Sequence, residues 1–268
     1  MAVLLALESA TEGAGVALAD ERGLLAEVRL GRGRRHAETL APAIQEVCRL
    51  AQVTLAGLDA LAVDVGPGLF TGLRVGLATA KGLAMGLGRP VVGLSSLQLL
   101  LAGAAALRAR GPVLAVVDAR RGEVFWSQAE LDGTAPWWRT GAPAPTASKP
   151  EVGPPAALAW VVQELVAAGR VPLLLGDGAW RYREEMERAG GQVADPALAG
   201  LAPGLLAEVA LAELAAGRAQ SPEAVGPLYL READAQIDWA RRHPTRPRVE
   251  PPGAPDGAPP PVEGASPS

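Results

Sequence analysis

The residues that could do chemistry in this chain are concentrated in three short turns. The first turn runs from Glu8 to Gly13, the second from Asp118 to Gly122, and the third is the tripeptide Gly176-Asp177-Gly178. Hydroxyl groups, guanidinium groups and the backbone amides of glycine all bind phosphate oxygens. These turns therefore predict a contact with a nucleotide phosphate or with a partner, through Thr11, Arg120, Arg121, Gly176 and Gly178.

The same turns contain features that oppose strong phosphate binding. Glu12 would repel a triphosphate placed beside it. Arg120 and Arg121 add positive charge but remove the close backbone approach that glycine would allow. The alternative is a solvated turn in which these arginines form ion pairs with Glu12 or Glu123. We expect no resident cofactor and no efficient hydrolysis, and leave open a residual nucleotide or one bound at a subunit interface.

Groups that bind metals or act as nucleophiles are scarce. The chain has two histidines, His36 and His243, and one cysteine, Cys48. A single cysteine excludes an internal disulfide and a cysteine zinc cluster, and no motif around it indicates a nucleophile. His36 lies in line with the apolar stripe of a predicted helix, and no carboxylate or nucleophile is spaced to work with it. We expect no catalytic residue and no metal site.

The most distinctive segment is rich in glycine. An apolar run over 58–65 predicts a buried strand, and the sequence Gly66-Pro67-Gly68 then leads into a helix over 71–87 with almost no polar face. A helix of this kind must be covered on more than one side. We expect one stripe to lie on the sheet and the other to form a helical bundle with a partner subunit, together with a helix over 37–52. The predicted interface is His36, Leu40, Ile44, Val47, Gly72, Leu73, Gly76, Leu77, Ala80 and Ala84.

That interface has a plain alternative, in which the rest of the monomer covers both stripes. Gly72 and Gly76 favour the interface, because glycine lets another backbone approach closely. A large apolar patch left exposed to water is also rare on a soluble monomer.

Composition sets the broad class of the protein. The chain has 268 residues, is 49% hydrophobic and carries a formal net charge of −4. This is enough apolar material for a large core, and it is unlike the basic footprint of a protein that grips nucleic acid alone. The apolar segment at 1–7 is too short and lacks the basic start of a signal peptide, and no apolar run is long enough to span a bilayer. We expect a cytoplasmic protein with no membrane contact.

The order of the predicted elements indicates an internal duplication. Three short apolar segments separated by turn residues predict an antiparallel meander, and alternating helices and strands follow it. A second meander begins near residue 113, with a candidate third strand at 136–140, and helices follow at 158–168, 179–189 and 204–216. The pattern predicts an α/β protein with the duplicated actin-like ATPase (ribonuclease H-like, ASKHA) fold, each half a mixed sheet flanked by helices. We expect subdomains at 1–110 and 111–232, a loop at 141–155, and a disordered proline-rich tail at 244–268.

Four motifs resemble those of one known family over residues 2–232. They are the segment 66–76 with its Lys81-Gly82-Leu83-Ala84 continuation, the segment 117–126, Pro227-Leu228-Tyr229-Leu230-Arg231-Glu232, and His36-Ala37-Glu38-Thr39-Leu40. Together they resemble the TsaB (YeaZ) family. The resemblance implies an inactive relative of TsaD that pairs with TsaD in making N6-threonylcarbamoyladenosine at position 37 of tRNA. It also implies the TsaE ATPase as a further partner, a homodimer as a candidate state when alone, and only indirect contact with tRNA.

One departure from the TsaD pattern bears on catalysis. TsaD-type proteins carry an Asn-His-x-x-x-His run, in which two histidines one helical turn apart can clamp a metal ion. Ser96 and Leu100 stand at the corresponding positions here. We therefore expect a non-catalytic subunit. The alternative is a stand-alone nucleotide-binding ATPase or kinase of the actin-like fold, which would need intact phosphate turns; no ligand set supports a metalloprotease.

Overall fold

The first sheet is built from the predicted meander and two parallel strands. In the computed structural model, which describes residues 2–31, 36–195, 197 and 200–230, the strand order is β3-β2-β1-β4-β5. The strands are β1 (Leu4–Glu8), β2 (Ala14–Asp20), β3 (Gly23–Leu30), β4 (Ala60–Asp64) and β5 (Val91–Leu94). Strand β1 pairs antiparallel with β2 and parallel with β4. Both β1 and β4 are fully buried, which explains why they read as continuous apolar runs.

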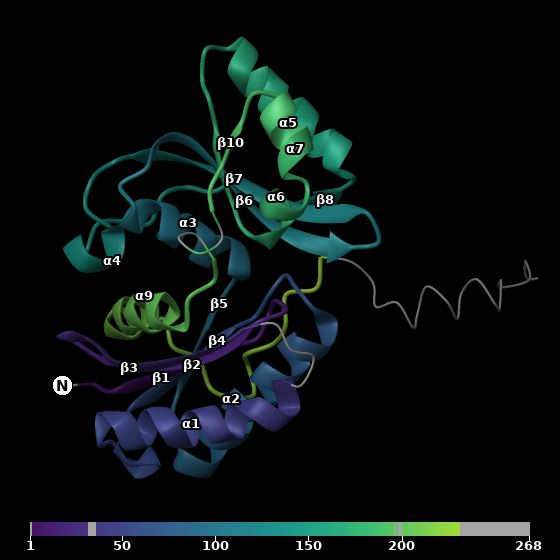
Figure 1. Ribbon diagram of the computed structural model, residues 1–268. Helices are drawn as coiled ribbons and strands as arrows, with labels where there is room; N and C mark the ends of the chain where they lie inside the picture. Colours follow the sequence, from purple (N-terminus) through teal and green to yellow (C-terminus); the bar gives the residue numbers. More distant parts are fainter. Residues whose placement is uncertain (1, 32–35, 196, 198–199, 231–268) are drawn as a thin grey trace, which may run out of the picture. The chain divides into compact units, whose positions relative to one another are not determined.

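The second sheet repeats this arrangement. Its order is β10-β9-β6-β7-β8, so β6 and β7 take the places of β1 and β2 (Figure 1). The strands are β6 (Arg110–Arg120), β7 (Glu123–Asp132), β8 (Glu151–Gly153), β9 (Leu173–Leu175) and β10 (Gln192–Val193). Strand β6 pairs antiparallel with β7 and parallel with β9. The predicted duplication of a mixed sheet flanked by helices is confirmed.

Helices cover both faces of the first sheet. On one face lie α1 (His36–Ala51) and α2 (Phe70–Leu87), and on the other lies α9 (Pro203–Ala215), as Figure 1 shows. Helix α2 ends at Gly88, whose left-handed φ of 64° and amide contacts to the last turn make it the C-cap. Helix α3 (Ser96–Ala106) starts with a capping box between Ser95 and Gln98 and packs on both β6 and α9.

The remaining described helices belong mainly to the second half. They are α4 (Trp137–Thr140), α5 (Pro155–Ala167), α6 (Asp177–Arg181) and α7 (Arg183–Arg188), and a 3-10 turn, η1 (Leu55–Gly57), precedes β4. The candidate strand at 136–140 is wrong, because this segment forms α4. The single helix predicted over 179–189 is also wrong, because Tyr182 separates α6 from α7 with non-helical φ and ψ of −108° and 28°. The predicted loop at 141–155 contains β8 and the first residue of α5.

The residues that the structure describes form one unit by their contacts. Helix α9 follows the second sheet in sequence, yet it packs on β1 and β2 of the first sheet. The subdomain boundary near residue 110 stays a prediction. Helix α9 comes after this boundary in the sequence but packs on the first sheet. The tail at 244–268 and the motif residues Arg231 and Glu232 lie outside the described residues. None of the helices that the structure describes is long and apolar enough to cross a membrane.

Candidate functional site

The first two chemistry-bearing turns lie against one another. Arg120, at the end of β6, donates from Nη2 to Oε1 of Glu12 at 2.9 Å, which joins the β6–β7 turn to the β1–β2 turn. Its other terminal nitrogen lies 3.2 Å from Oδ2 of Asp118. The ion pair with Glu12 that we weighed as the alternative is therefore present. Phosphate at this point would compete with two carboxylates for one guanidinium.

The arginine turn has an unusual backbone. Arg120 and Arg121 both have positive φ, 62° and 55°, which non-glycine residues adopt at a cost of about 1–2 kcal/mol each. Arg121 and Gly122 are the central residues of a two-residue hairpin, whose favoured turn type needs positive φ at both positions. The hairpin therefore explains the positive φ of Arg121. The irregularity in strand register just before Arg120 explains the positive φ of Arg120.

The third turn is tied to β6 rather than open to a ligand. A Cβ on Gly176 would lie 2.1 Å from the Val116 carbonyl oxygen, and one on Gly178 would lie 2.8 Å from the Val117 carbonyl carbon. Between them, Oδ1 of Asp177 accepts a hydrogen bond from the Asp118 amide at 3.0 Å. Both glycines are buried, so their close approach to β6 is sufficient to explain why glycine stands at these positions.

Two buried carboxyl groups lie at the ends of neighbouring parallel strands, and the sequence did not single them out. Glu8 ends β1 and accepts from the Ala10 amide at 2.7 Å. Asp64 ends β4 and accepts from the Gly66 amide at 2.7 Å and from the Ser96 hydroxyl at 2.7 and 2.9 Å. An acidic residue that closes an otherwise apolar strand is the signal that could have identified both.

Burial controls the protonation of these groups. It raises the pKa of Asp64 to about 7, although the Gly66 amide and the Ser96 hydroxyl oppose the shift. Burial, followed by the nearby Asp64 carboxylate, raises the pKa of Glu8 well above its ordinary value. Burial also raises the pKa of Asp177. Within the described part of the chain, no group of three or more acidic, histidine or cysteine side chains could hold a metal ion.

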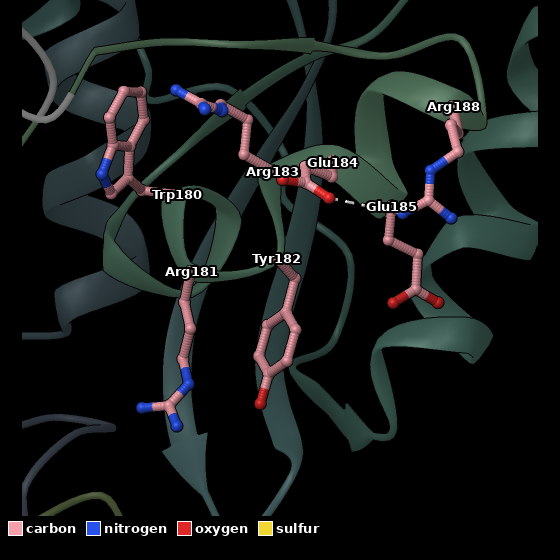
Figure 2. Close-up of a pocket in the computed structure, with 7 residues that line it drawn as sticks. All are labelled: Trp180, Arg181, Tyr182, Arg183, Glu184, Glu185 and Arg188. Atoms are coloured by element: carbon pink, nitrogen blue, oxygen red, sulfur yellow. Dashed lines mark ion pairs between the residues drawn. The ribbon is translucent and has the colours of Figure 1, made fainter.

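A groove lies on α6 and α7, a few residues past the third turn. It is lined by Trp180, Arg181, Tyr182, Arg183, Glu184, Glu185 and Arg188. Figure 2 shows Arg183 extending toward Trp180, whereas Arg181 and Tyr182 point together away from that pair. Sequence reasoning missed this groove, because the residues lie within a segment that we predicted to be one regular helix.

Comparison with known proteins finds a relative that matches nearly the whole chain. The tRNA threonylcarbamoyladenosine biosynthesis protein TsaB of Escherichia coli strain K12 is 30% identical over 243 residues, which span 89% of this chain and 97% of that protein. The chain belongs to the TsaB family.

Three further matches bear on this assignment, one to a YeaZ structure and two to TsaD-type proteins. The solved structure of YeaZ from Pseudomonas aeruginosa matches with a TM-score of 0.68 and 29% sequence identity, over 86% of this chain and all of that one. The family model described as TsaD, tRNA N6-adenosine threonylcarbamoyltransferase, matches residues 27–135. A threonylcarbamoyltransferase of Symbiobacterium thermophilum is 51% identical over 65 residues, but these span only 19% of that enzyme. This TsaB-family chain is thus related to TsaD over part of its length.

The two positions compared with the TsaD histidines are occupied by core residues in this TsaB-family chain. Ser96 is fully buried, and its hydroxyl donates to both oxygens of Asp64. Leu100 is 2% exposed and packs in the core between α3 and the second sheet. At the positions where TsaD-type proteins carry two metal-binding histidines, this chain therefore has side chains that pack in the core.

The residues predicted to form the partner interface need correction. Nine of them are buried inside the protomer and so do not form its surface; they are Leu40, Ile44, Val47, Gly72, Leu73, Gly76, Leu77, Ala80 and Ala84. The tenth, His36, begins α1, but its side chain lies outside the described residues. The register of both helices turns these apolar stripes toward the sheet, where they form one core cluster with β1, β2 and β4.

The glycines of α2 allow close approach by another part of the same chain, whereas the sequence analysis expected a partner subunit to approach there. A Cβ on Gly76 would lie 2.1 Å from the hydroxyl oxygen of Ser9, which donates to the Gly72 carbonyl oxygen at 2.9 Å. The backbone that approaches α2 is therefore the β1–β2 turn of the same chain. Gly68 makes a similar approach, since its Cβ would lie 2.2 Å from the Ala10 carbonyl oxygen.

The outer face of α2 carries a different cluster of side chains. Phe70 is 40% exposed and Tyr229 is 47% exposed, and their ring centroids are 5.7 Å apart. The Arg74 guanidinium lies 3.7 Å from the centroid of the Phe70 ring, and its Nε donates to the Tyr229 hydroxyl at 3.1 Å. Met85, one of the most exposed large apolar residues at 59%, lies toward the other end of the helix. We call Phe70, Arg74 and Tyr229 the outer cluster.

Proposed function

We propose that this chain is a non-catalytic partner subunit that TsaD needs for N6-threonylcarbamoylation of adenosine 37 in tRNA. The observation that carries the proposal is the similarity to Escherichia coli TsaB, which extends over 97% of that biosynthesis protein. The partial match to the TsaD family model supports a shared ancestry with the transferase itself. This similarity between the chain and its proposed partner supports pairing of the two.

The side chains at the two positions compared with the TsaD histidines support a role without chemistry. The Ser96 hydroxyl is engaged by Asp64, and Leu100 contributes only apolar surface to the core. The acidic groups at the strand ends have raised pKa values, so at neutral pH they hold protons more readily than free carboxylates do. The alternative of a stand-alone ATPase or kinase is less well supported, because Arg120 is already paired with Glu12.

The proposed contact with TsaD moves from the inner to the outer face of α2. The outer cluster has the composition of an interface hot spot, with two aromatic rings and an arginine held together by stacking and a hydrogen bond. Exposed α1 residues, including Leu50 at 51% exposure, add apolar area on the neighbouring helix. The same surface would serve a homodimer in the absence of TsaD, and TsaE would act on the TsaD-bound pair.

The test is binding of TsaD to chains altered in the outer cluster. Phe70→Ala and Arg74→Glu should each weaken TsaD binding at least about tenfold in calorimetry, which is the lower range for hot-spot truncation. Neither should change the circular dichroism spectrum, because both side chains project from the helix. The matched control is Trp160→Ala on α5, a residue that is 62% exposed in the second half and should bind TsaD normally.

Two outcomes would count against this proposal. Wild-type affinity in both outer-cluster variants would contradict the interface assignment. Threonylcarbamoyl transfer to tRNA by this chain alone, without TsaD, would contradict the non-catalytic role. Loss of transfer activity when the chain is omitted from a reconstituted system with TsaD and TsaE is the expected result.

A further inference from the structure

The groove on α6 and α7 combines aromatic rings with guanidinium groups. Trp180 is 38% exposed, and the guanidinium carbon of Arg183 lies 4.6 Å from the centroid of its ring. Arg181 lies 5.8 Å from the ring centroid of Tyr182. The volume of the groove is about 430 Å³, within the size range of small-ligand sites. It is therefore large enough for a nucleotide and offers flat surfaces on which a base can stack.

The charges of the groove are only partly neutralised. Arg183 forms no ion pair with any residue that the structure describes. Arg188 lies 3.7 Å from Glu184 in a contact where both side chains are more than 70% exposed, and such surface pairs contribute little to stability (Figure 2). Arg181 pairs at 3.0 Å with Asp118 but remains 52% exposed. Arg183 and Arg188 can therefore donate to a phosphate without first breaking a buried contact. Arg181 would share its half-exposed guanidinium between a phosphate and the buried Asp118 carboxylate.

The elements that carry these side chains are anchored from below. Gly176 and Gly178 hold the start of α6 against β6, and the Met186 side chain of α7 is fully buried. The exposed rings and guanidinium groups thus project from a supported surface rather than from a loose loop. A supported surface loses less conformational entropy when it binds a ligand.

The combination distinguishes between classes of ligand. An acidic peptide would use the guanidinium groups but would leave the exposed indole without a matching flat partner. A nucleotide in a single-stranded segment supplies both a base that stacks on an aromatic ring and a phosphate that a guanidinium binds. The observations therefore favour single-stranded RNA over an acidic peptide.

We propose that the groove formed by α6 and α7 binds an unstacked nucleotide of an RNA chain. The base stacks on the Trp180 ring in the place that the Arg183 guanidinium takes in this structure, and the flanking phosphates lie on Arg181, Arg183 and Arg188. This inference rests on the proposed function, so the RNA is the tRNA substrate. The chain contacts the tRNA directly rather than only through its partner. The second half of the molecule then contributes to substrate binding, while the outer cluster of the first half contributes to partner binding.

The experiment measures binding of fluorescently labelled, unmodified tRNA to the full chain by anisotropy at low salt. Trp180→Ala and Arg183→Glu should each weaken binding about tenfold, because the loss of one base–aromatic stack corresponds to roughly that change. The matched controls are Trp160→Ala, which removes an indole that is 62% exposed on α5, and Arg218→Glu, which makes the same charge change beyond α9. Both controls should retain at least half of the wild-type affinity.

Each remaining result would overturn the inference. These results are no saturable tRNA binding by the wild-type chain, equal affinities in wild type and Trp180→Ala, or an equal loss in Trp160→Ala. Complete displacement of tRNA by a stoichiometric amount of AMP would indicate a site for a free nucleotide instead. Measuring TsaD binding by the Trp180→Ala chain separates the two proposals. If this variant binds both TsaD and tRNA as the wild type does, the RNA site is contradicted and the proposed partner role is not.

Discussion

The two faces of α2 are both apolar over much of their length, yet they have opposite relations to the rest of the chain. The inner face presents glycines, leucines and alanines that are buried against the sheet and the β1–β2 turn. The outer face presents Phe70, Arg74 and Met85 to solvent. The inner face is made of small residues because its own chain approaches it closely. Large residues that remain exposed are the better indicator of a surface available to a partner.

The largest expected effect comes from a bulky residue on the inner face. Gly76→Arg places a side chain at a buried position, where the Ser9 hydroxyl oxygen lies 2.1 Å from the Cβ position. We expect a loss of about 4 kcal/mol or more in the free energy of unfolding, measured by urea denaturation.

The matched control lies on the other side of the same helix. A Cβ on Gly82 meets no atom within 4 Å, so Gly82→Arg should leave stability unchanged or slightly raised, since arginine favours a helix more than glycine does. Equal urea midpoints for the Gly76→Arg and Gly82→Arg chains would show that the two faces do not differ in the way described.

A second test of the inner side uses pH. The folded-state pKa of Asp64 is about 7, above the 3.8 of a free aspartate, so the folded protein holds a proton that the unfolded chain releases. The contribution of Asp64 to the free energy of unfolding should therefore be fully present below pH 4, and should be lost as pH rises toward 7. Urea denaturation of wild type and Asp64→Asn across this range measures the effect, with a shallower slope expected for the variant. An unchanged slope would mean that Asp64 titrates normally.

The smallest predicted effect concerns the hydroxyl that faces Asp64. Ser96→Ala removes two hydrogen bonds from a buried carboxyl group, and we expect a loss of about 1–3 kcal/mol in the free energy of unfolding at pH 8, where the group is ionised. The loss should be smaller at pH 5, where Asp64 keeps its proton. A loss of the same size at both pH values would indicate a packing effect rather than a hydrogen bond to the charged form.

The elements of the fold were largely predictable, because local signals fixed them. Turn residues separated β1, β2 and β3, and Gly88 marked the end of α2. The side of α2 that faces inward was not predictable, since both stripes are apolar and only the position of the β1–β2 turn decides between them. The strained register at Arg120 likewise depends on pairing between β6 and β7, which a single segment does not reveal.

The candidate site was predictable only in part. The alternative for the arginine turn, ion pairs with Glu12 or Glu123, followed from the charges of these residues, and the structure shows Arg120 paired with Glu12. The glycines at 176 and 178 were read as phosphate contacts, but their burial against β6 depends on a tertiary contact. The groove at Trp180 was missed because the break at Tyr182 carries neither glycine nor proline, the residues that usually mark the end of a helix.

The packing of α9 on β1 and β2 has a consequence for how this protein is made. Strands β1 and β2 leave the ribosome before the second sheet, but the helix that shields one of their apolar sides is translated after that sheet. Until then one apolar face of this sheet is exposed in the nascent polypeptide, which makes the chain prone to aggregation. Chaperones that hold such surfaces during translation would therefore act on the first sheet of this chain, and would be released when α9 emerges.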